Sequence, residues 1–339
     1  MKLSASNTKK FSELIDSAEQ ILILSPDFPD LDSVGTNIAL AKTFVGMGKQ
    51  VRLLSSQPLK NSYAWIDWSD RYMTKEDMRL VRRDKPDLVV ITDASGRSMF
   101  REIIEGDEWL LDEIPVILID HHQTEADYPV AVGIIEPGAA ATGELLYYLY
   151  QSMGWEITPE QANLMLAGIA FDTNRFENSN VGYGVLHVAA ELVKLGGDFY
   201  AVTQAILAAK AYDEVKFKTI AKLEQSAVVM APIAYLAVPF SEINHLKANT
   251  SLVKPLVESL RTIKDIRVSF VLIEKDDKSI ILSFRSQPGI DVATVAEHFG
   301  GGGHAVAASA RITGMDMTDA TIAVLKQLEP LLTEEKKEK

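Results

Sequence analysis

The sequence predicts an α/β protein with two domains: an N-terminal domain on a parallel sheet with helices on both faces, and a smaller C-terminal α+β domain. Three observations lead to this prediction. Short apolar segments alternate with helical ones in the first half of the chain, as in strand–helix–strand units. Helical patterns then dominate from about Gly143 to Glu224. Strand patterns return near Ser226, where a second core is expected to begin.

The strands of the N-terminal domain are expected where the sequence is β-branched and mostly apolar, a composition typical of strands that are covered on both faces. These segments are residues 20–24, 51–54, 87–92 and 115–119. A helix is expected between the first two of them, from about Ser33 to Met47, with Gly46 and Gly48 near its end.

One helix start in the middle of the chain is well marked. Thr158 is a good N-cap residue, Pro159 follows at the first helical position, and Gln161 stands at the third. We expect this helix to run to about Ile169 and to place Asp172 just beyond its end.

The C-terminal domain is expected to combine three strand segments with three helices. The strand patterns cover residues 228–238, 266–273 and 278–284, and Asp276-Asp277 supply a turn before the last of them. The helical patterns cover residues 251–260, 292–298 and 316–332. The expected division is a first domain, a helical linker, a second domain and a disordered tail, at residues 1–208, 209–225, 226–333 and 334–339.

Composition limits the kind of partner and the compartment. A chain of 339 residues with 47% hydrophobic content can bury two cores. The net charge of −13 argues against a broad basic surface for duplex DNA and favours short nucleotides as ligands. The absence of cysteine excludes disulfides and thiolate metal sites. Because no apolar stretch approaches the roughly 20 residues that cross a bilayer, and no signal peptide is recognisable, we expect a cytoplasmic protein without membrane contact.

Acidic residues and histidines stand after several of the predicted strands and helices. Asp120-His121-His122 ends one apolar run, and three further acidic segments contain Asp30 with Asp32, Asp93, and Asp172. An open α/β sheet usually places its site at the carboxyl ends of its strands, so we expect these side chains to meet. Imidazole and carboxylate ligands without sulfur favour Mn²⁺, with Mg²⁺ or Co²⁺ as alternatives. A pair of such ions can activate water for phosphodiester hydrolysis.

These motifs, together with Gly300-Gly-Gly-Gly-His304 far downstream, resemble the DHH phosphoesterases that carry a DHHA1 domain. The nanoRNase/pAp-phosphatase branch of that family is similar over roughly residues 15–315. The resemblance implies an N-terminal DHH domain that binds metal and a C-terminal DHHA1 domain that binds substrate. It also implies hydrolysis of nanoRNA, pAp or dinucleotides by metal-activated water, and it is compatible with a homodimer formed through the first domain.

The resemblance assigns a role to each candidate residue. One ion would be bound by Asp32, Asp93, His121 and Asp172. Asp93 would bridge to a second ion, which Asp30 also binds. His122 would contact the phosphate or help to protonate the leaving group, and Asp120 would orient its neighbours.

The phosphate pocket is expected in the C-terminal domain, facing the metal site across a cleft. Arg285 can offer two parallel donors to a phosphate and is followed by Ser286, and His304 can donate to the substrate or stack on a base. Backbone N–H groups of the glycine run can converge on a phosphate, at Gly301, Gly302 and Gly303. Arg97, four residues after Asp93, could also reach substrate phosphate.

The first motif departs from the family pattern His-x-x-Pro-Asp-x-Asp, because Pro26 stands at the position of the histidine. Three explanations are open. Asp27 could supply the missing ligand, or the second ion, the one that Asp30 binds, could be recruited weakly together with substrate phosphate. Alternatively, the protein could be a catalytically impaired nucleotide-binding sensor or scaffold. Asn174 is a milder departure, because it replaces a glycine that commonly follows Asp-Thr, and asparagine tolerates left-handed backbone geometry.

Overall fold

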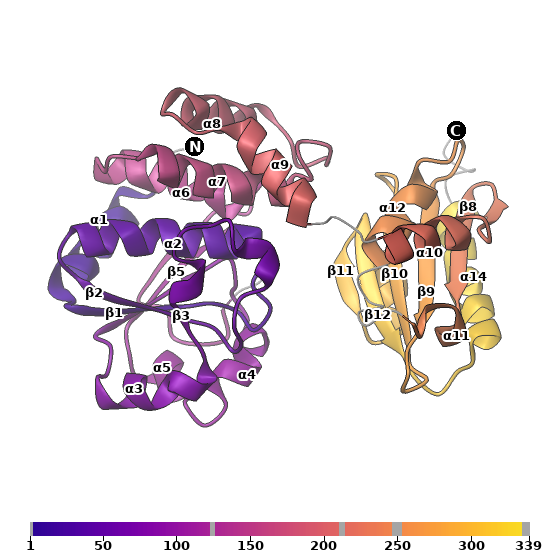
Figure 1. The fold of residues 1–339 in the computed structure, drawn as a ribbon, viewed down its shortest axis with the longest axis horizontal. Coiled ribbons are helices and arrows are strands. Elements are labelled where there is room, and N and C mark those ends of the chain that lie inside the picture. Colours follow the sequence, from indigo (N-terminus) through magenta and orange to yellow (C-terminus); the bar gives the residue numbers. More distant parts are fainter. Residues whose placement is uncertain (1–2, 123–125, 210–213, 246–252, 334–339) are drawn as a thin grey trace. The chain divides into compact units, whose positions relative to one another are not determined.

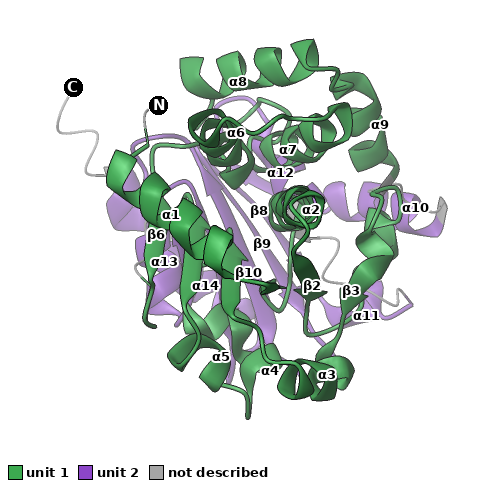
Figure 2. Cartoon of the chain, turned by 90° about the vertical axis from the view of Figure 1, so that its left-hand side faces the viewer, with its two compact units in different colours: residues 1–211 green, residues 212–339 purple. Residues whose placement is uncertain are grey.

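The chain forms two compact units, Met1–Ala211 and Tyr212–Lys339, drawn green and purple in Figure 2. A computed structural model describes residues 3–122, 126–209, 214–245 and 253–333. Each unit has its own sheet and its own hydrophobic clusters. Residues 210–213 of the expected linker and the expected tail, residues 334–339, lie outside the described residues.

The first unit is built on a six-stranded sheet in which every pairing is parallel, in the order β3-β2-β1-β4-β5-β6. The strands are β1 Gln20–Leu24, β2 Gln50–Leu54, β3 Tyr72–Met73, β4 Leu88–Thr92, β5 Val116–Asp120 and β6 Val132–Ile135. The strand order reverses between β1 and β4. In open α/β sheets this reversal opens a crevice beyond the carboxyl ends of the two strands, which is where ligands bind.

Helices cover both faces of this sheet (Figure 1). One face is covered by α1, α2, α6 and α7, against which α8 and α9 pack, and the other face by the short helices α3, α4 and α5. Their bounds are α1 Ala5–Ser17, α2 Leu31–Gly46, α3 Met78–Arg83, α4 Arg101–Ile104, α5 Trp109–Asp112, α6 Thr142–Met153, α7 Pro159–Asp172, α8 Tyr183–Lys194 and α9 Phe199–Ala209. Four short 3-10 turns lie at Asn61–Tyr63, Ser69–Arg71, Lys75–Asp77 and Arg97–Phe100.

The two helical layers explain why β1 is apolar throughout. Successive side chains of a strand point to opposite faces of its sheet. Ile21 and Ile23 accordingly pack with α2, α6 and α7, whereas Leu22 and Leu24 pack with the short helices on the other face. All four side chains are buried, so a polar residue at any of them would lose its contact with water.

The second unit contains a mixed six-stranded sheet in the order β11-β12-β10-β9-β8-β7, in which only β8 and β9 pair in parallel. Its strands are β7 Val228–Met230, β8 Ile233–Val238, β9 Val268–Glu274, β10 Ile280–Ser286, β11 Gly302–His304 and β12 Ala307–Ile312. The helices α10 and α12 pack on one face and α13 and α14 on the other. The helices of this unit are α10 Glu214–Glu224, α11 Phe240–Ile243, α12 Val253–Arg261, α13 Ala293–His298 and α14 Met317–Thr333.

The predicted fold class is confirmed, with differences in detail. Residues 228–238 form two strands instead of one, because Pro232 lacks the N–H that a continuous strand would need. The helix α7 continues as far as Asp172, so this residue ends the helix and does not follow it. The short strands β3, β6, β11 and β12 were not expected. Residues 251 and 252 of one expected helix lie outside the described residues.

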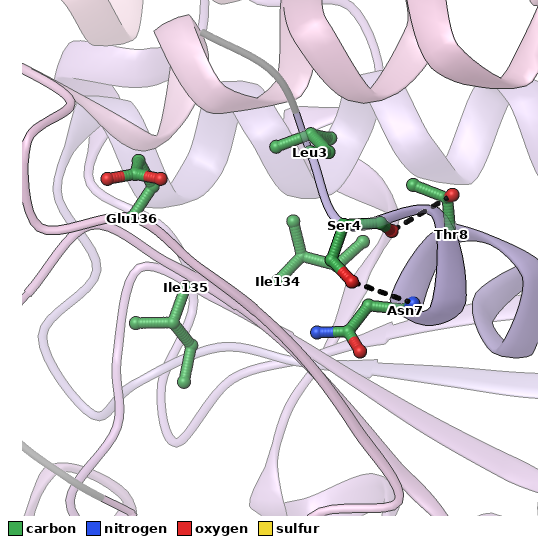
Figure 3. Close-up of a pocket in the computed structure, with 7 residues that line it drawn as sticks. All are labelled: Leu3, Ser4, Asn7, Thr8, Ile134, Ile135 and Glu136. Carbon is green, nitrogen blue, oxygen red and sulfur yellow. Dashed lines mark hydrogen bonds between the residues drawn. The ribbon is translucent and has the colours of Figure 1, made fainter.

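Two further features of the described residues complete the fold. No helix among them is long and apolar enough to cross a membrane. At the β6 edge of the first sheet, a pocket forms where Leu3, Ser4 and Thr8 meet Ile134 and Glu136 (Figure 3). The residues that line this pocket do not include the site residues predicted from the sequence.

Candidate metal centre

Four of the predicted ligands meet at the carboxyl ends of the first sheet. Asp32 lies in the first turn of α2, Asp93 directly follows β4, His121 directly follows β5, and Asp172 ends α7. One potential ligand atom of each side chain lies within 4.8 Å of those of the other three. The site therefore draws on elements that lie as far apart in sequence as α2 and α7, and the crevice at the reversal of strand order brings them together.

Asp32 is held by the start of α6. Its carboxylate is fully buried and accepts hydrogen bonds from the backbone N–H groups of Thr142 at 2.6 Å and Gly143 at 2.9 Å. Gly168 of α7 leaves the space for it, because a Cβ atom at residue 168 would lie 2.0 Å from Asp32 Oδ1. Burial, followed by the charges of Asp172 and Asp93, raises the pKa of Asp32 well above its usual value.

Asp93 adopts an unusual backbone conformation. Its φ of 60° lies in the left-handed region, which costs a non-glycine residue on the order of 1–3 kcal/mol and is found most often at functional sites. The hydroxyl of Thr142 donates to Asp93 Oδ1 at 3.1 Å, and the Asp93 side chain is 5% exposed. The same residue of α6 thus contacts two of the four candidate ligands, Asp32 through its N–H and Asp93 through its hydroxyl.

His121 presents one nitrogen to the carboxylates. Its Nδ1 lies 3.2 Å from the carbonyl oxygen of Ala139, which can only accept a hydrogen bond, so Nδ1 carries the proton. Nε2 lies 3.2 Å from Asp172 and 3.5 Å from Asp93. This buried nitrogen has no hydrogen-bond partner among the described residues. An imidazole whose second nitrogen is fixed by a backbone carbonyl is the usual arrangement of a metal-binding histidine.

The charges of the cluster favour a cation. Burial, followed by the charges of Asp93 and Asp172, raises the pKa of Asp30 to about 8. Burial works against the charged form of His121, but the carboxylates of Asp172 and Asp93 outweigh it and raise the pKa of His121 to about 11. Carboxylates packed this closely need protons or a positive ion to offset their repulsion. The donor set, the unpartnered Nε2 and the repulsion all fit a divalent metal ion.

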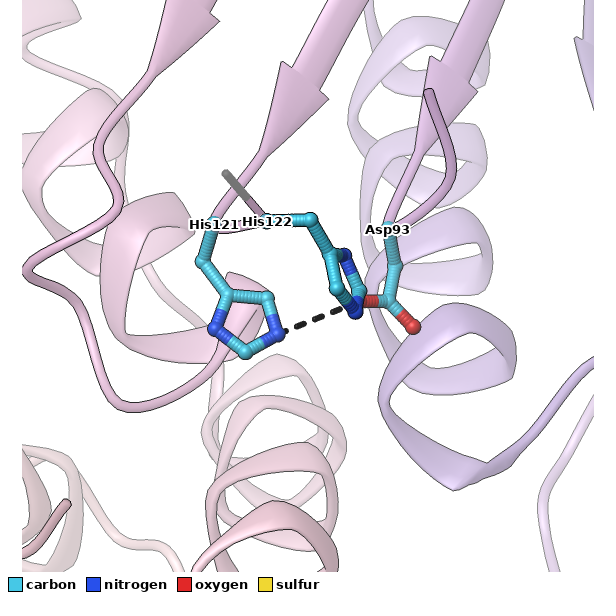
Figure 4. Close-up of side chains that lie close together, drawn as sticks. All are labelled: Asp93, His121 and His122. Carbon is cyan, nitrogen blue, oxygen red and sulfur yellow. Dashed lines mark ion pairs between the residues drawn. The ribbon is translucent and has the colours of Figure 1, made fainter. Parts of the chain in front are cut away.

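His122 lies beside the cluster, and its Nδ1 is 3.8 Å from Asp93 Oδ1. Figure 4 shows the two imidazoles, from the segment after β5, facing Asp93. His122 Nδ1 donates to Asp120 Oδ1 at 2.7 Å, and this bond, which outweighs burial, raises the pKa of His122. Because Nδ1 is occupied and the side chain is 35% exposed, Nε2 is left for a ligand. Asp120 is fully buried and accepts from this ring, and the orienting role that the resemblance implies for it stays a prediction.

Three residues predicted near the site, Asp30, Asp27 and Arg97, do not belong to the four-ligand group and have other partners. Asp30 caps α2 by accepting from the N–H groups of Asp32 and Ser33. Asp27 accepts from the backbone N–H groups of Glu102 at 2.7 Å and Ile103 at 3.1 Å. Both of its oxygens are therefore engaged at α4. The guanidinium of Arg97 pairs with Asp112.

The predicted phosphate-binding residues lie in the second unit. Arg285 Nε donates to Glu258 at 2.8 Å, and its Nη1 donates to the carbonyl of Phe284. Ser286 is buried and donates to the carbonyl of Ile290 at 2.7 Å. His304 is exposed at the end of β11.

The glycines beside His304 are required by close strand packing. A Cβ atom on Gly301 would lie 2.0 Å from the carbonyl oxygen of Ser309, and one on Gly303 would lie 2.6 Å from that of Ala307. Nothing lies within 4 Å of the corresponding position on Gly302, so this glycine has open space around it. Packing between β11 and β12 thus accounts for two of the glycines without any ligand.

Residues that support the ligands were missed in the sequence. Thr142, Gly143 and Gly168 contact Asp32, and the Ala139 carbonyl fixes the ring of His121. Gly168 stands four residues before Asp172, and hence on the same side of α7. That spacing in the sequence could have indicated that Gly168 lies beside the site. No signal marked Ala139, because any residue can supply a backbone carbonyl.

Two family models match the chain in the order of its two units. The DHH family, N-terminal domain, matches residues 20–169, and the DHHA1 domain matches residues 231–330. The chain thus carries a DHH domain followed by a DHHA1 domain. The resemblance inferred from the motifs is thereby confirmed. The candidate ligands Asp32, Asp93 and His121 lie within the residues that the DHH model matches, and Asp172 lies just beyond them.

Curated relatives align with most of the DHH/DHHA1 chain. The cyclic-di-AMP phosphodiesterase GdpP of Bacillus subtilis is 27% identical over 91% of this chain and 47% of its own length. The bifunctional oligoribonuclease and PAP phosphatase NrnA of Thermus thermophilus is 26% identical over 90% and 88%, and that of Mycoplasma genitalium is 29% identical over 88% and 90%. The chain therefore spans about half the length of GdpP and most of the length of NrnA.

Solved structures show the same DHH/DHHA1 fold. An exopolyphosphatase-related protein from Bacteroides fragilis superposes with a TM-score of 0.86 at 20% identity, over 97% of this chain and 98% of its own. RecJ from Thermus thermophilus, in complex with Mn²⁺, superposes with a TM-score of 0.56 at 15% identity, over 97% and 55%. At these identities the likeness concerns the fold alone.

Proposed function

We propose that the protein is a metal-dependent phosphodiesterase that hydrolyses short oligoribonucleotides or small nucleotides, such as nanoRNA, pAp or dinucleotides. The observation that carries this proposal is the meeting of three carboxylates and one imidazole within 4.8 Å. Its relatives include a cyclic-di-AMP phosphodiesterase and a bifunctional oligoribonuclease and PAP phosphatase. Their names support a substrate that is a nucleotide with a phosphoester bond.

The ion would be held by Asp32, Asp93, His121 and Asp172. Mixed nitrogen and oxygen ligands without sulfur suit Mn²⁺, with Mg²⁺ or Co²⁺ as alternatives. A second ion would use Asp93 and Asp30. When bound, such ions activate water and offset the negative charge of a phosphate. RecJ, whose fold is similar, was solved in complex with Mn²⁺.

His122 would supply a proton to the leaving group. Asp120 accepts from its Nδ1 and so leaves Nε2 available to a substrate. The same bond raises the pKa of His122 and so favours the protonated form of the ring. A positioned acid of this kind contributes roughly 10²–10⁴-fold to a rate.

The second unit would contribute donors for nucleotide binding. His304 is exposed at the end of β11, and Arg285 keeps guanidinium N–H groups beyond those bonded to Glu258 and Phe284. The net charge of −13 disfavours long polyanions, whose binding depends on many basic contacts. Short substrates need only a few local donors, so we propose these as the natural class.

A second candidate function, a nucleotide-binding sensor or scaffold with impaired catalysis, is favoured by the first motif. Pro26 is buried and offers no ligand atom, and both oxygens of Asp27 are bonded to the backbone of α4. For Asp27 to replace the missing imidazole, it would have to leave Glu102 and Ile103. The second ion is therefore left with fewer protein ligands than the first.

Hydrolysis of a panel of dinucleotides and pAp, with Mn²⁺, Mg²⁺ or EDTA, tests the first proposal. We expect turnover that needs metal and is lost in Asp93→Ala. Asp87→Ala is the matched control, because Asp87 stands just before the other end of β4 and bonds to the backbone of Glu19 and Gln20. Nucleotide binding without turnover in any metal would favour the sensor, and the absence of both would exclude both functions.

A further inference from the structure

Residues 139–143, which lead into α6, contact three of the four candidate ligands. The N–H groups of Thr142 and Gly143 donate to the two oxygens of Asp32. The Thr142 hydroxyl donates to Asp93, and the carbonyl of Ala139 accepts from His121 Nδ1. A shift of this short segment would therefore displace two carboxylates and one imidazole together.

The segment is held from both sides at Ala140. The carboxylate of Glu144 accepts from the Ala140 N–H at 2.8 Å, and Asn180 donates to the Ala140 carbonyl at 3.1 Å. Glu144 is 4% exposed although its side chain is acidic. Gly184 of α8 makes room for it, because a Cβ atom there would lie 2.8 Å from Glu144 Oε1. Three elements thus converge on one buried carboxylate that is not itself within the metal cluster.

We infer that Glu144 is a positioning residue of the metal centre, an inference that rests on the proposed metal-dependent function. By fixing the Ala140 N–H, it holds the neighbouring Ala139 carbonyl where His121 Nδ1 must donate to it. That bond fixes the proton on Nδ1, so Nε2, which is directed at Asp93 and Asp172, is the nitrogen that would face a bound metal ion. Glu144 therefore sets both the orientation and the tautomer of His121, and through Thr142 it sets the place of Asp32.

The expected loss of Mn²⁺ affinity follows from what is known of groups that orient metal ligands. Replacing a group that orients a metal ligand typically weakens metal binding about 10–100-fold. Glu144→Ala removes the acceptor for Ala140 and is expected to weaken Mn²⁺ binding by at least about tenfold. Glu144→Gln keeps an oxygen acceptor at the same reach, so it is expected to restore Mn²⁺ affinity to within a few-fold of the unsubstituted protein.

Mn²⁺ binding to the full chain, titrated by electron paramagnetic resonance of the free ion, is the primary measurement. Asp107→Ala is the control for loss of a buried carboxylate, because Asp107 is 1% exposed and bonds to Arg82 and Trp109. We expect Asp107→Ala to lower the melting temperature without changing Mn²⁺ affinity. Equal Mn²⁺ affinity for Glu144→Ala and the unsubstituted protein would overturn the inference, whatever the change in melting temperature.

A second variant keeps the test decisive if Glu144→Ala does not fold. Asn180 is exposed, and Asn180→Ala removes only the bond to the Ala140 carbonyl from the other side. It should weaken Mn²⁺ binding in the same direction by a smaller factor, and an unchanged affinity would count against the inference. Metal-dependent turnover of the unsubstituted protein is measured in parallel. If the unsubstituted protein neither binds Mn²⁺ nor turns over substrate, the proposed function is refuted. If it does both, and the Glu144 and Asn180 variants bind Mn²⁺ equally well, only the role of Glu144 is refuted.

Discussion

Replacing Gly168 by alanine is expected to disable the candidate metal centre without altering any ligand. A Cβ atom at residue 168 would lie 2.0 Å from Asp32 Oδ1 and 3.0 Å from Asp32 Cα, and ordinary contact begins at 3.4 Å. The carboxylate must therefore move by about 1.4 Å, or α7 must move away from α2. A shift of the carboxylate breaks the bonds of 2.6 Å and 2.9 Å that Asp32 receives from Thr142 and Gly143, whereas a shift of α7 moves Asp172 away from Asp32.

The magnitude follows from these two bonds. A hydrogen bond to a charged group contributes roughly 1.5–3 kcal/mol, so losing two costs about 3–6 kcal/mol. Alanine gains back about 1 kcal/mol over glycine inside a helix. We therefore expect Gly168→Ala to lower the free energy of unfolding by about 2–5 kcal/mol and to weaken Mn²⁺ binding, since Asp32 no longer faces Asp93 and Asp172.

Urea unfolding in EDTA and Mn²⁺ titration measure the two effects. Gly46→Ala is the matched control: Gly46 ends α2, and nothing lies within 4 Å of its Cβ position. It is expected to leave stability unchanged or to raise it by up to about 1 kcal/mol. If Gly168→Ala unfolds at the same urea concentration as Gly46→Ala and binds Mn²⁺ equally well, the reasoning on this contact is wrong.

Three other predictions concern the site. His122→Gln is expected to lower kcat by about 10²-fold or more while Mn²⁺ affinity stays the same; unchanged kcat would remove His122 from proton transfer. Pro26→His is expected to raise the number of Mn²⁺ ions bound per chain, measured by equilibrium dialysis, and an unchanged number would show that this position does not reach the metal. The folded-state pKa values of Asp30 (about 8) and His121 (about 11) exceed those of the unfolded chain. Without metal, the folded state therefore binds more protons than the unfolded state between about pH 4 and pH 11. Its free energy of unfolding is accordingly expected to fall as pH rises through this range. The melting temperature in EDTA should accordingly be lower at about pH 8.5 than at about pH 6. Mn²⁺ should raise the melting temperature more at the higher pH, and a rise that is equal at both pH values would contradict this reasoning.

The local sequence pattern was sufficient to locate the helices and strands whose own residues mark them clearly. The strand at residues 20–24 could be located because both of its faces are buried, and the start of α7 because its first turn carries its own capping residues. Weak elements escaped detection. β11 consists of two glycines and a histidine, and only its pairing with β12 makes it a strand. Pro232 divided one expected strand into two, which sequence reasoning should have recognised.

By itself, the sequence determined the family, the fold class and the residue types of the metal cluster, because motifs and apolar periodicity are local properties. Only the tertiary structure decided how those residues are supported. The bonds of Asp32 come from α6, the space for its carboxylate comes from Gly168 of α7, and the tautomer of His121 comes from a backbone carbonyl. The structure also showed that both oxygens of Asp27 are already bonded to α4. Such contacts join residues as far apart in the sequence as Asp32 and Gly168, and backbone groups carry much of the chemistry, so no pattern of side chains along the chain could have shown them.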